Sequence, residues 1–145
     1  MKRLFAGLLA VVLLVAYAAG PVAAGGRTPD QLVKEAKAAV KEVSIQDVKK
    51  MIDGKENIII LDVRDKNELE DGRIPGAINI SRGMLEFKVG MTIPDRNAKI
   101  VVYCGLDLRS PLAVRTLNEM GYVNAVNMAG GLKAWTEAGY PLVKQ

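Results

Sequence analysis

Short, uninterrupted apolar runs alternate along the chain with segments whose apolar residues recur at helical spacing. The runs at residues 57–61 and 99–103 predict strands buried on both faces, because such strands lack polar alternation. Shorter strands are predicted at 77–80 and 125–127. Helices are predicted over residues 46–52, 66–70, 110–120 and 132–138, and Gly54, Gly72 and Gly121 end the first three. Ser44 can cap the first helix, and Gly130-Gly131 predicts a tight turn before the last one. Residues 82–98 are irregular and predict loop with a short helix. This alternation predicts an α/β domain with a mostly parallel sheet.

A further helix is predicted near the beginning of this region. Thr28 has the chemistry of an N-cap, Pro29 suits the first helical position, and Asp30 lies at the positive end of the helix dipole. Leu32, Val33, Ala36, Ala39 and Val40 then recur at helical spacing, so we expect an amphipathic helix to about Val43. A surface helix packed on the domain is favoured over a partner-binding helix.

The first 24 residues have the order of a secretory signal peptide. Lys2 and Arg3 precede an apolar run from Leu4 to Ala19, and small residues follow before Gly25. The run has 16 residues, whereas a membrane span needs about 20, so a cleaved signal is favoured over an uncleaved membrane anchor. Cleavage is expected after Ala24, with Ala18 as the alternative. The predicted division is a signal peptide over 1–24, a helical extension over 25–42 and a domain over 43–145, exported to a bacterial periplasm.

Composition narrows the chemistry that this domain can perform. The 145 residues include no histidine and one cysteine, which excludes a Ser-His-Asp triad, a Cys-His pair, a histidine metal site and an internal disulfide. A thiol–disulfide oxidoreductase with paired cysteines is excluded for the same reason. The net charge of +4 falls to +2 without the predicted signal, and no basic block is flanked by aromatic residues. Nucleic-acid binding is therefore not expected, and neither a cofactor nor a metal is implied.

The single cysteine lies where a predicted strand gives way to a predicted helix. Cys104 follows the strand, and Gly105, Leu106, Asp107, Leu108, Arg109 and Ser110 lead into the helix. Sites in open α/β sheets form at the carboxyl ends of strands. Backbone N–H groups and a helix N-terminus there stabilise a thiolate or a persulfide anion. The alternative is an inert, buried cysteine.

Three groups of residues resemble the rhodanese-like (sulfurtransferase) family. They are Leu61-Asp62-Val63-Arg64 with Glu68, Gly72 and the run Ile74–Ile80; Ile100–Cys104 with Arg109-Ser110; and Gly130-Gly131, Trp135 and Gly139-Tyr140-Pro141. The resemblance covers about residues 43–143. It implies a five-stranded sheet flanked by helices on both faces. It also implies transfer of sulfane sulfur through a Cys104 persulfide, with Asp62 and Arg64 supporting the loop and Arg109 fixing it or binding an anionic donor.

The resemblance further implies the reaction partners. The donor would be thiosulfate, polysulfide or a protein persulfide, and the acceptor would be cyanide, a thiol or a protein. Membrane association would require an uncleaved signal. A rhodanese-like domain can also serve as a sulfur carrier or a non-catalytic interaction module, which remains the alternative function.

Two features of the loop bear on its substrate. Glycine often occupies the position of Asp107 in the family, and a carboxylate there would disfavour the thiolate and repel thiosulfate. Its effect would shrink if the side chain turned outward or paired with Arg109 or Arg115. The phosphatases and arsenate reductases that resemble this fold have a loop with five residues between the cysteine and the arginine. In this chain four residues separate Cys104 from Arg109. Phosphatase activity is therefore not favoured. Arg73 stands where the family often has histidine, a position that is mainly structural.

Overall fold

A computed structural model describes residues 25–144. Its centre is a five-stranded sheet in the order β1-β5-β4-β2-β3, in which all neighbouring strands are parallel. The strands span Glu42–Val43 (β1), Ile59–Asp62 (β2), Ile78–Asn79 (β3), Ile100–Tyr103 (β4) and Ala125–Met128 (β5). The central strand β4 is buried along its whole length, as its apolar sequence predicts.

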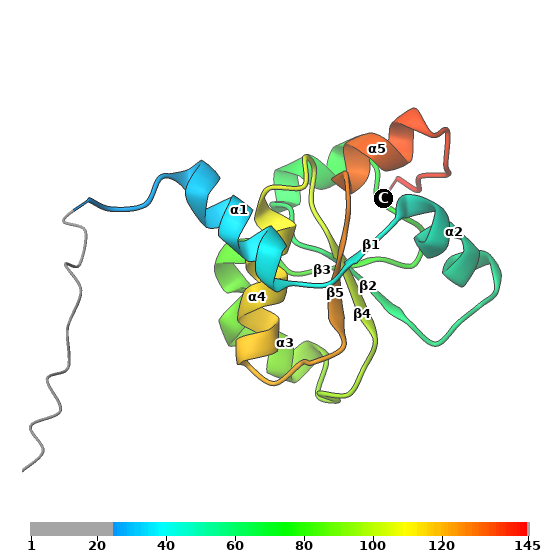
Figure 1. The fold of residues 1–145 in the computed structure, drawn as a ribbon. Helices are drawn as coiled ribbons and strands as arrows, with labels where there is room; N and C mark the ends of the chain where they lie inside the picture. Colours follow the sequence, from blue (N-terminus) through cyan, green and yellow to red (C-terminus); the bar gives the residue numbers. More distant parts are fainter. Residues whose placement is uncertain (1–24, 145) are drawn as a thin grey trace, which may run out of the picture.

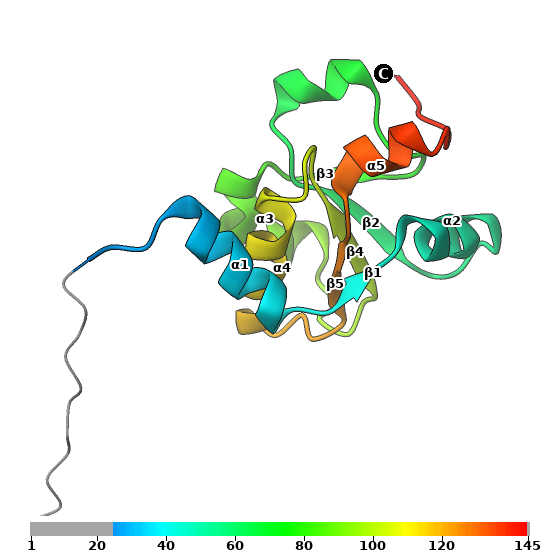
Figure 2. The same ribbon diagram turned by 45° about the horizontal axis from the view of Figure 1, so that its top comes forward.

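Helices cover both faces of the sheet (Figures 1 and 2). One face carries α3 (Leu85–Thr92) and α4 (Arg109–Glu119), with α1 (Pro29–Ala39) packed against α4. The other face carries α2 (Ile45–Asp53) and α5 (Gly131–Glu137). Two 3-10 helices, η1 (Lys66–Asp71) and η2 (Arg82–Met84), lie between the longer elements in the chain. The α/β fold with a parallel sheet between two helical layers is therefore confirmed. None of the helices described is long and apolar enough to cross a membrane.

Each helical layer encloses its own hydrophobic cluster. The α3–α4 side contains Leu61, Leu85, Ile100, Val102 and Leu117, and the α2–α5 side contains Val48, Ile60, Val101, Tyr103 and Trp135. Alternate residues of β4 thus supply the two clusters. This burial fixes the carboxyl end of β4, where the cysteine lies.

Several predicted helix ends are confirmed. Thr28 and Ser44 cap α1 and α2 through their side chains, and Gly54 ends α2. Gly121, with a φ of 93°, follows α4 in the left-handed conformation that glycine adopts most readily.

The region around Val43 differs from the prediction. The helix ends at Ala39, and Glu42–Val43 forms edge strand β1, which pairs with Asn127–Met128. A two-residue strand is too short to produce a period-two pattern, so periodicity could not reveal it. The predicted boundary at 42/43 falls inside this strand. The segment predicted as a helix over 66–70 is a 3-10 turn. The predicted signal peptide lies outside the described residues.

Candidate active site

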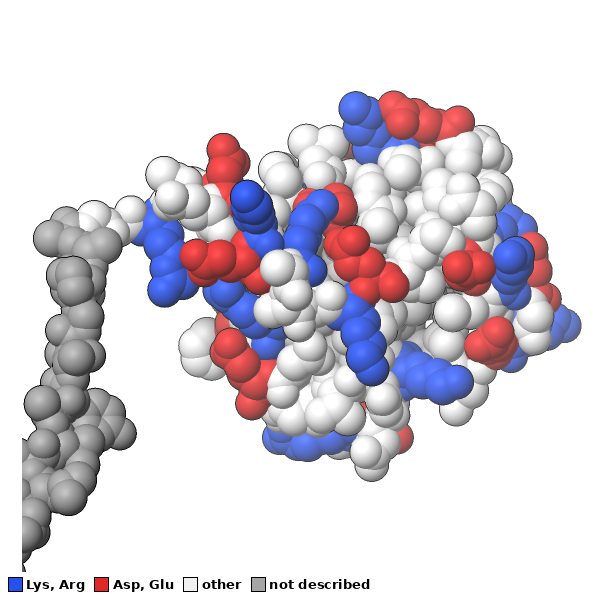
Figure 3. All heavy atoms as spheres, viewed as in Figure 1, with Lys and Arg blue, Asp and Glu red and all other residues white. Residues whose placement is uncertain are grey.

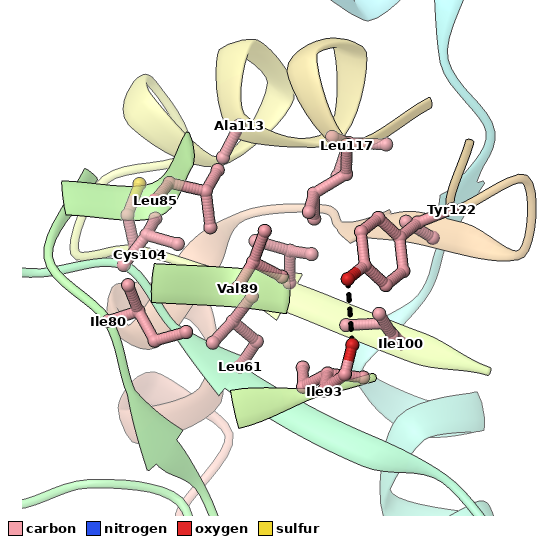
Figure 4. Packing of buried hydrophobic residues seen from close by; sticks show 14 residues of the cluster. Leu61, Ile80, Leu85, Val89, Ile93, Ile100, Cys104, Ala113, Leu117 and Tyr122 are labelled. Carbon is pink, nitrogen blue, oxygen red and sulfur yellow. Dashed lines mark hydrogen bonds between the residues drawn. The ribbon is translucent and has the colours of Figure 1, made fainter. Parts of the chain in front are cut away.

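Cys104 lies directly beyond the end of β4 and closes one corner of the α3–α4 cluster (Figure 4). Its exposed fraction is only 1%, and its neighbours in that cluster include Leu85 and Ala113. The Ser110 hydroxyl, in the first turn of α4, donates a hydrogen bond to Sγ at 3.5 Å. The thiol is therefore buried and faces a hydroxyl in the first turn of α4, at the end of the helix that carries partial positive charge.

The loop after Cys104 keeps its backbone N–H groups free. Within the described part of the chain, the N–H groups of residues 105–108 donate no hydrogen bond to another protein group. In contrast, the carbonyls of Cys104 and Gly105 accept hydrogen bonds from the N–H groups of Leu132 and Lys133, at 2.8 and 3.0 Å. The loop thus has its acceptors bound and its donors available, as an anion-holding loop requires.

Gly131 brings α5 close enough to make these bonds. A Cβ at this position would lie 2.8 Å from both the Asp107 nitrogen and the Cys104 carbonyl oxygen, and its φ is +62°. Only glycine meets both demands without displacing the loop. The sequence predicts a tight turn here but does not reveal that the turn supports the cysteine loop.

Arg109 does not extend into the loop as a free cation. Its two terminal nitrogens donate to the two carboxylate oxygens of Glu68 at 2.7 Å each, and Asp65 lies 3.7 Å away. These hydrogen bonds from Arg109 lower the pKa of Glu68 to about 2, although partial burial opposes the shift. This ion pair, called here the Arg109–Glu68 clamp, ties the beginning of α4 to η1. Of the two roles predicted for Arg109, this geometry supports fixing the loop.

Asp62 and Arg64 form a second ion pair, which is buried and contacts the backbone of Glu68. Arg64 donates from Nε and one terminal nitrogen to the Asp62 carboxylate, with a shortest distance of 2.7 Å. The same guanidinium donates to the carbonyls of Glu68, within η1, and of Gly72, directly after its end, so it holds the second half of η1. The Tyr103 hydroxyl donates to Asp62 at 2.7 Å. Burial and the neighbouring Asp62 charge raise the pKa of Tyr103 well above its ordinary value.

Asp107 has a partner that the sequence did not suggest. Its carboxylate accepts hydrogen bonds from Lys37 Nζ at 2.5 Å, from Asn127 Nδ2 at 2.8 Å and from the Gly130 N–H at 3.0 Å. It pairs with neither Arg109 nor Arg115. Its effect on the thiol was expected to shrink if the carboxylate was paired, and the partner is Lys37 instead of either arginine. The effect of Asp107 on the thiol stays a prediction.

Two apolar side chains project beside the loop. Leu106 and Leu108 belong to the loop and are 64% and 51% exposed. Gly105 and Leu106 line an open depression of about 420 Å³ together with residues of α5 and of the η1 region. Its other lining residues are Leu132, Lys133, Thr136 and Glu137 of α5, and Arg64, Glu68 and Asp71. The surface beside the loop is thus mostly polar and charged, with Leu106 as an apolar element.

Comparison with known proteins assigns the family. The rhodanese-like domain family matches residues 44–138, and the chain belongs to it. Over 101 residues the chain is 31% identical to the thiosulfate sulfurtransferase GlpE of Shewanella oneidensis, covering 70% of this chain and 97% of the relative. It is 31% identical over 99 residues to YrkF of Bacillus subtilis, covering 68% of this chain. The match spans about half of YrkF (52%).

A solved structure agrees on the fold. RPA3614 of Rhodopseudomonas palustris CGA009, described as a protein of unknown function and a possible tyrosine phosphatase, superimposes with a TM-score of 0.75. It is 32% identical, and the match covers 81% of this chain and 95% of that protein.

Proposed function

We propose that this protein is an exported single-domain sulfurtransferase that moves a sulfane sulfur from a donor to a thiophilic acceptor through a Cys104 persulfide. The observation that carries the proposal is the placement of the only cysteine. Cys104 lies between the end of β4 and the N-terminus of α4, at the start of a loop whose N–H groups at residues 105–108 have no partner among residues 25–144. Membership of the rhodanese-like family and the similarity to a thiosulfate sulfurtransferase support it.

The reaction proceeds in two displacements. The Cys104 thiolate attacks the outer sulfur of the donor, the donor's sulfur–sulfur bond breaks, and its electron pair leaves with the donor as sulfite or a thiolate. The Cys104 persulfide then carries a negative outer sulfur, which the free loop N–H groups and the α4 N-terminus stabilise. Cyanide or a thiol attacks that outer sulfur and returns the thiolate.

Burial of Cys104 restricts the donor. Because only 1% of this residue is exposed, a donor must present its sulfane sulfur as a narrow, terminal atom. Thiosulfate, a polysulfide and a protein persulfide each satisfy that requirement. The Lys37–Asp107 ion pair weakens the electrostatic repulsion of thiosulfate by Asp107, so we retain thiosulfate as a donor.

Phosphatase activity is disfavoured by the arginine. A phosphatase loop of this type uses its arginine to bind the phosphoryl oxygens, whereas Glu68 occupies both terminal nitrogens of Arg109. The geometry therefore favours sulfur transfer, even though one structural relative is described as a possible phosphatase.

A steady-state assay tests the proposal. Transfer of sulfur to cyanide is measured with thiosulfate and, separately, with polysulfide, for the wild type and Cys104→Ser. The substitution removes the only thiol and keeps a side chain of similar size. We expect turnover with at least one donor in the wild type and none in the variant. Persulfide formation without turnover would instead support the sulfur-carrier alternative, and residual turnover in Cys104→Ser would refute the mechanism. Export is tested by locating the full-length protein after cell fractionation.

A further inference from the structure

A polar network links the N-terminal segment to the cysteine loop. Lys37 of α1 donates to Asp107, Asn127 of β5 donates to Asp107, and the same Asn127 amide donates to Glu42 of β1 at 2.9 Å. Asn127 is fully buried, and Asp107 is 6% exposed. Lys37 and Glu42 both precede residue 44, where the match to the family begins. The loop is therefore held in part by residues outside the region that defines the family.

Asp107 has a strained backbone conformation within the loop. Its φ is 59°, a left-handed conformation that costs energy for residues with a Cβ, although aspartate tolerates it better than most. Among the residues that the structure describes, the hydrogen bonds to its carboxylate come from other elements: α1, β5 and the Gly130 turn. The conformation of the loop backbone around Cys104 thus depends on bonds that reach it from outside.

Lys37 supplies the positive charge in this network. The Lys37 and Asp107 side chains are 38% and 8% exposed, so the carboxylate is buried while the ammonium group reaches it from the surface. Glu42 adds a second carboxylate to the network through Asn127. Acidic and basic side chains are mixed over the face that includes α1, which shows no broad basic patch (Figure 3). The charge of Lys37 has a specific partner.

The contact is also well supported mechanically. Ala36, next to Lys37, is fully buried, and α1 packs on α4, the helix that begins at the end of the loop. Helix α1 thus holds the side chain of Asp107, and α4, on which α1 packs, begins at Arg109 directly after the loop.

We infer that Lys37 is a positioning residue for the cysteine loop: through its ion pair with Asp107, helix α1 holds the loop in the conformation that accepts a sulfane sulfur on Cys104. This inference deepens the proposed function and rests on it for its consequence in sulfur transfer. Its structural part, control of the loop around Cys104 by α1, can be measured without any sulfur donor.

The test compares Lys37→Met with Lys34→Met. Lys34 lies on the same helix, is exposed, and makes no ion pair or hydrogen bond among the described residues. The first readout is the rate of Cys104 alkylation by iodoacetamide, under conditions where urea titration shows all variants fully folded. Because Cys104 is buried in the wild type, loss of the Asp107 anchor should loosen the loop. We expect alkylation to rise about tenfold in Lys37→Met, which corresponds to losing one charge-assisted hydrogen bond, and to stay unchanged in Lys34→Met.

A double-mutant cycle with Asp107→Asn identifies the partner. Asparagine tolerates the left-handed backbone and removes the charge. We expect Lys37→Met to have little further effect in the Asp107→Asn background, because the two substitutions break the same interaction. The second readout is kcat for sulfur transfer, which should fall in Lys37→Met and not in Lys34→Met.

The outcomes separate the two proposals. Equal alkylation rates in Lys37→Met and Lys34→Met, or additive effects in the cycle, would overturn the role of Lys37. Absence of sulfur transfer in every form, wild type included, would refute the proposed function and leave the alkylation comparison to decide the role of α1.

Discussion

Replacing Arg64 with methionine tests whether the buried ion pair supports the cysteine loop. The substitution keeps an unbranched side chain but removes the guanidinium, which donates to Asp62 and to the carbonyls of Glu68 and Gly72. Asp62 is fully buried, and among residues 25–144 its carboxylate would retain only the bonds from the Tyr103 hydroxyl and the backbone N–H of residue 64. Removing one partner of a buried pair typically costs about 3–5 kcal/mol.

The remaining bonds to Asp62 place the expected loss toward the lower end of that range, at about 3 kcal/mol. A loss of this size is a large part of the total stability of a small domain, which is about 5–15 kcal/mol. The loss should also reach the active site, because Arg64 holds η1 and Glu68 of η1 clamps Arg109. We therefore expect lower sulfur-transfer activity in the fraction that remains folded.

Urea unfolding followed by circular dichroism measures the free-energy change, with the slope checked for two-state behaviour. Arg73→Met is the matched control, because the Arg73 side chain makes no ion pair or hydrogen bond among residues 25–144. The double variant Arg64→Met/Asp62→Asn should recover part of the loss, since it leaves no unpaired buried charge. A loss below about 1 kcal/mol, or one equal to that of Arg73→Met, would refute this reasoning.

Two further predictions follow from the clamp and from the Gly131 contact. The folded-state pKa of Glu68 is lowered from its ordinary value to about 2, so the stability that its charge contributes is present above about pH 4.5 and is lost as the pH falls toward 2. Since Glu68 and Arg109 are each about one-third exposed, we expect this contribution to the free energy of unfolding to be about 1 kcal/mol. Urea titrations should show a steeper acid loss for the wild type than for Glu68→Gln, and parallel curves would contradict the assignment. Gly131→Ala should destabilise the protein by at least about 2 kcal/mol and reduce sulfur transfer, whereas Gly139→Ala, which has a similar φ but open space around its Cβ, should cost about 1 kcal/mol and spare activity. Equal effects of the two glycine substitutions would show that backbone conformation alone, and not contact with the loop, explains the Gly131 requirement.

The sequence predicts the elements that depend on local pattern. The apolar run at 99–103 specifies β4 because it is buried on both faces, and this strand sets the position of Cys104. Thr28 and Ser44 predict the beginnings of α1 and α2 because capping uses residues only three positions apart.

The loop's supports are not local, and the pattern does not reveal them. Lys37 and Asp107 are 70 residues apart in the chain, and Glu68 and Arg109 are 41 apart. Nothing in the spacing of charged residues selects these pairs from the others available on the surface. The effect of Asp107 depended on the direction of its side chain, which only the packing of α1 and β5 determines.

The central claim is that sulfur is carried on Cys104, and intact mass spectrometry tests it most directly. The protein is incubated with thiosulfate or polysulfide and separated from excess donor. Its intact mass is then measured before and after cyanide is added. We predict one added sulfur atom on the wild type, its loss with cyanide, and no adduct on Cys104→Ser. An adduct on the serine variant, or none on the wild type with either donor, would contradict the claim.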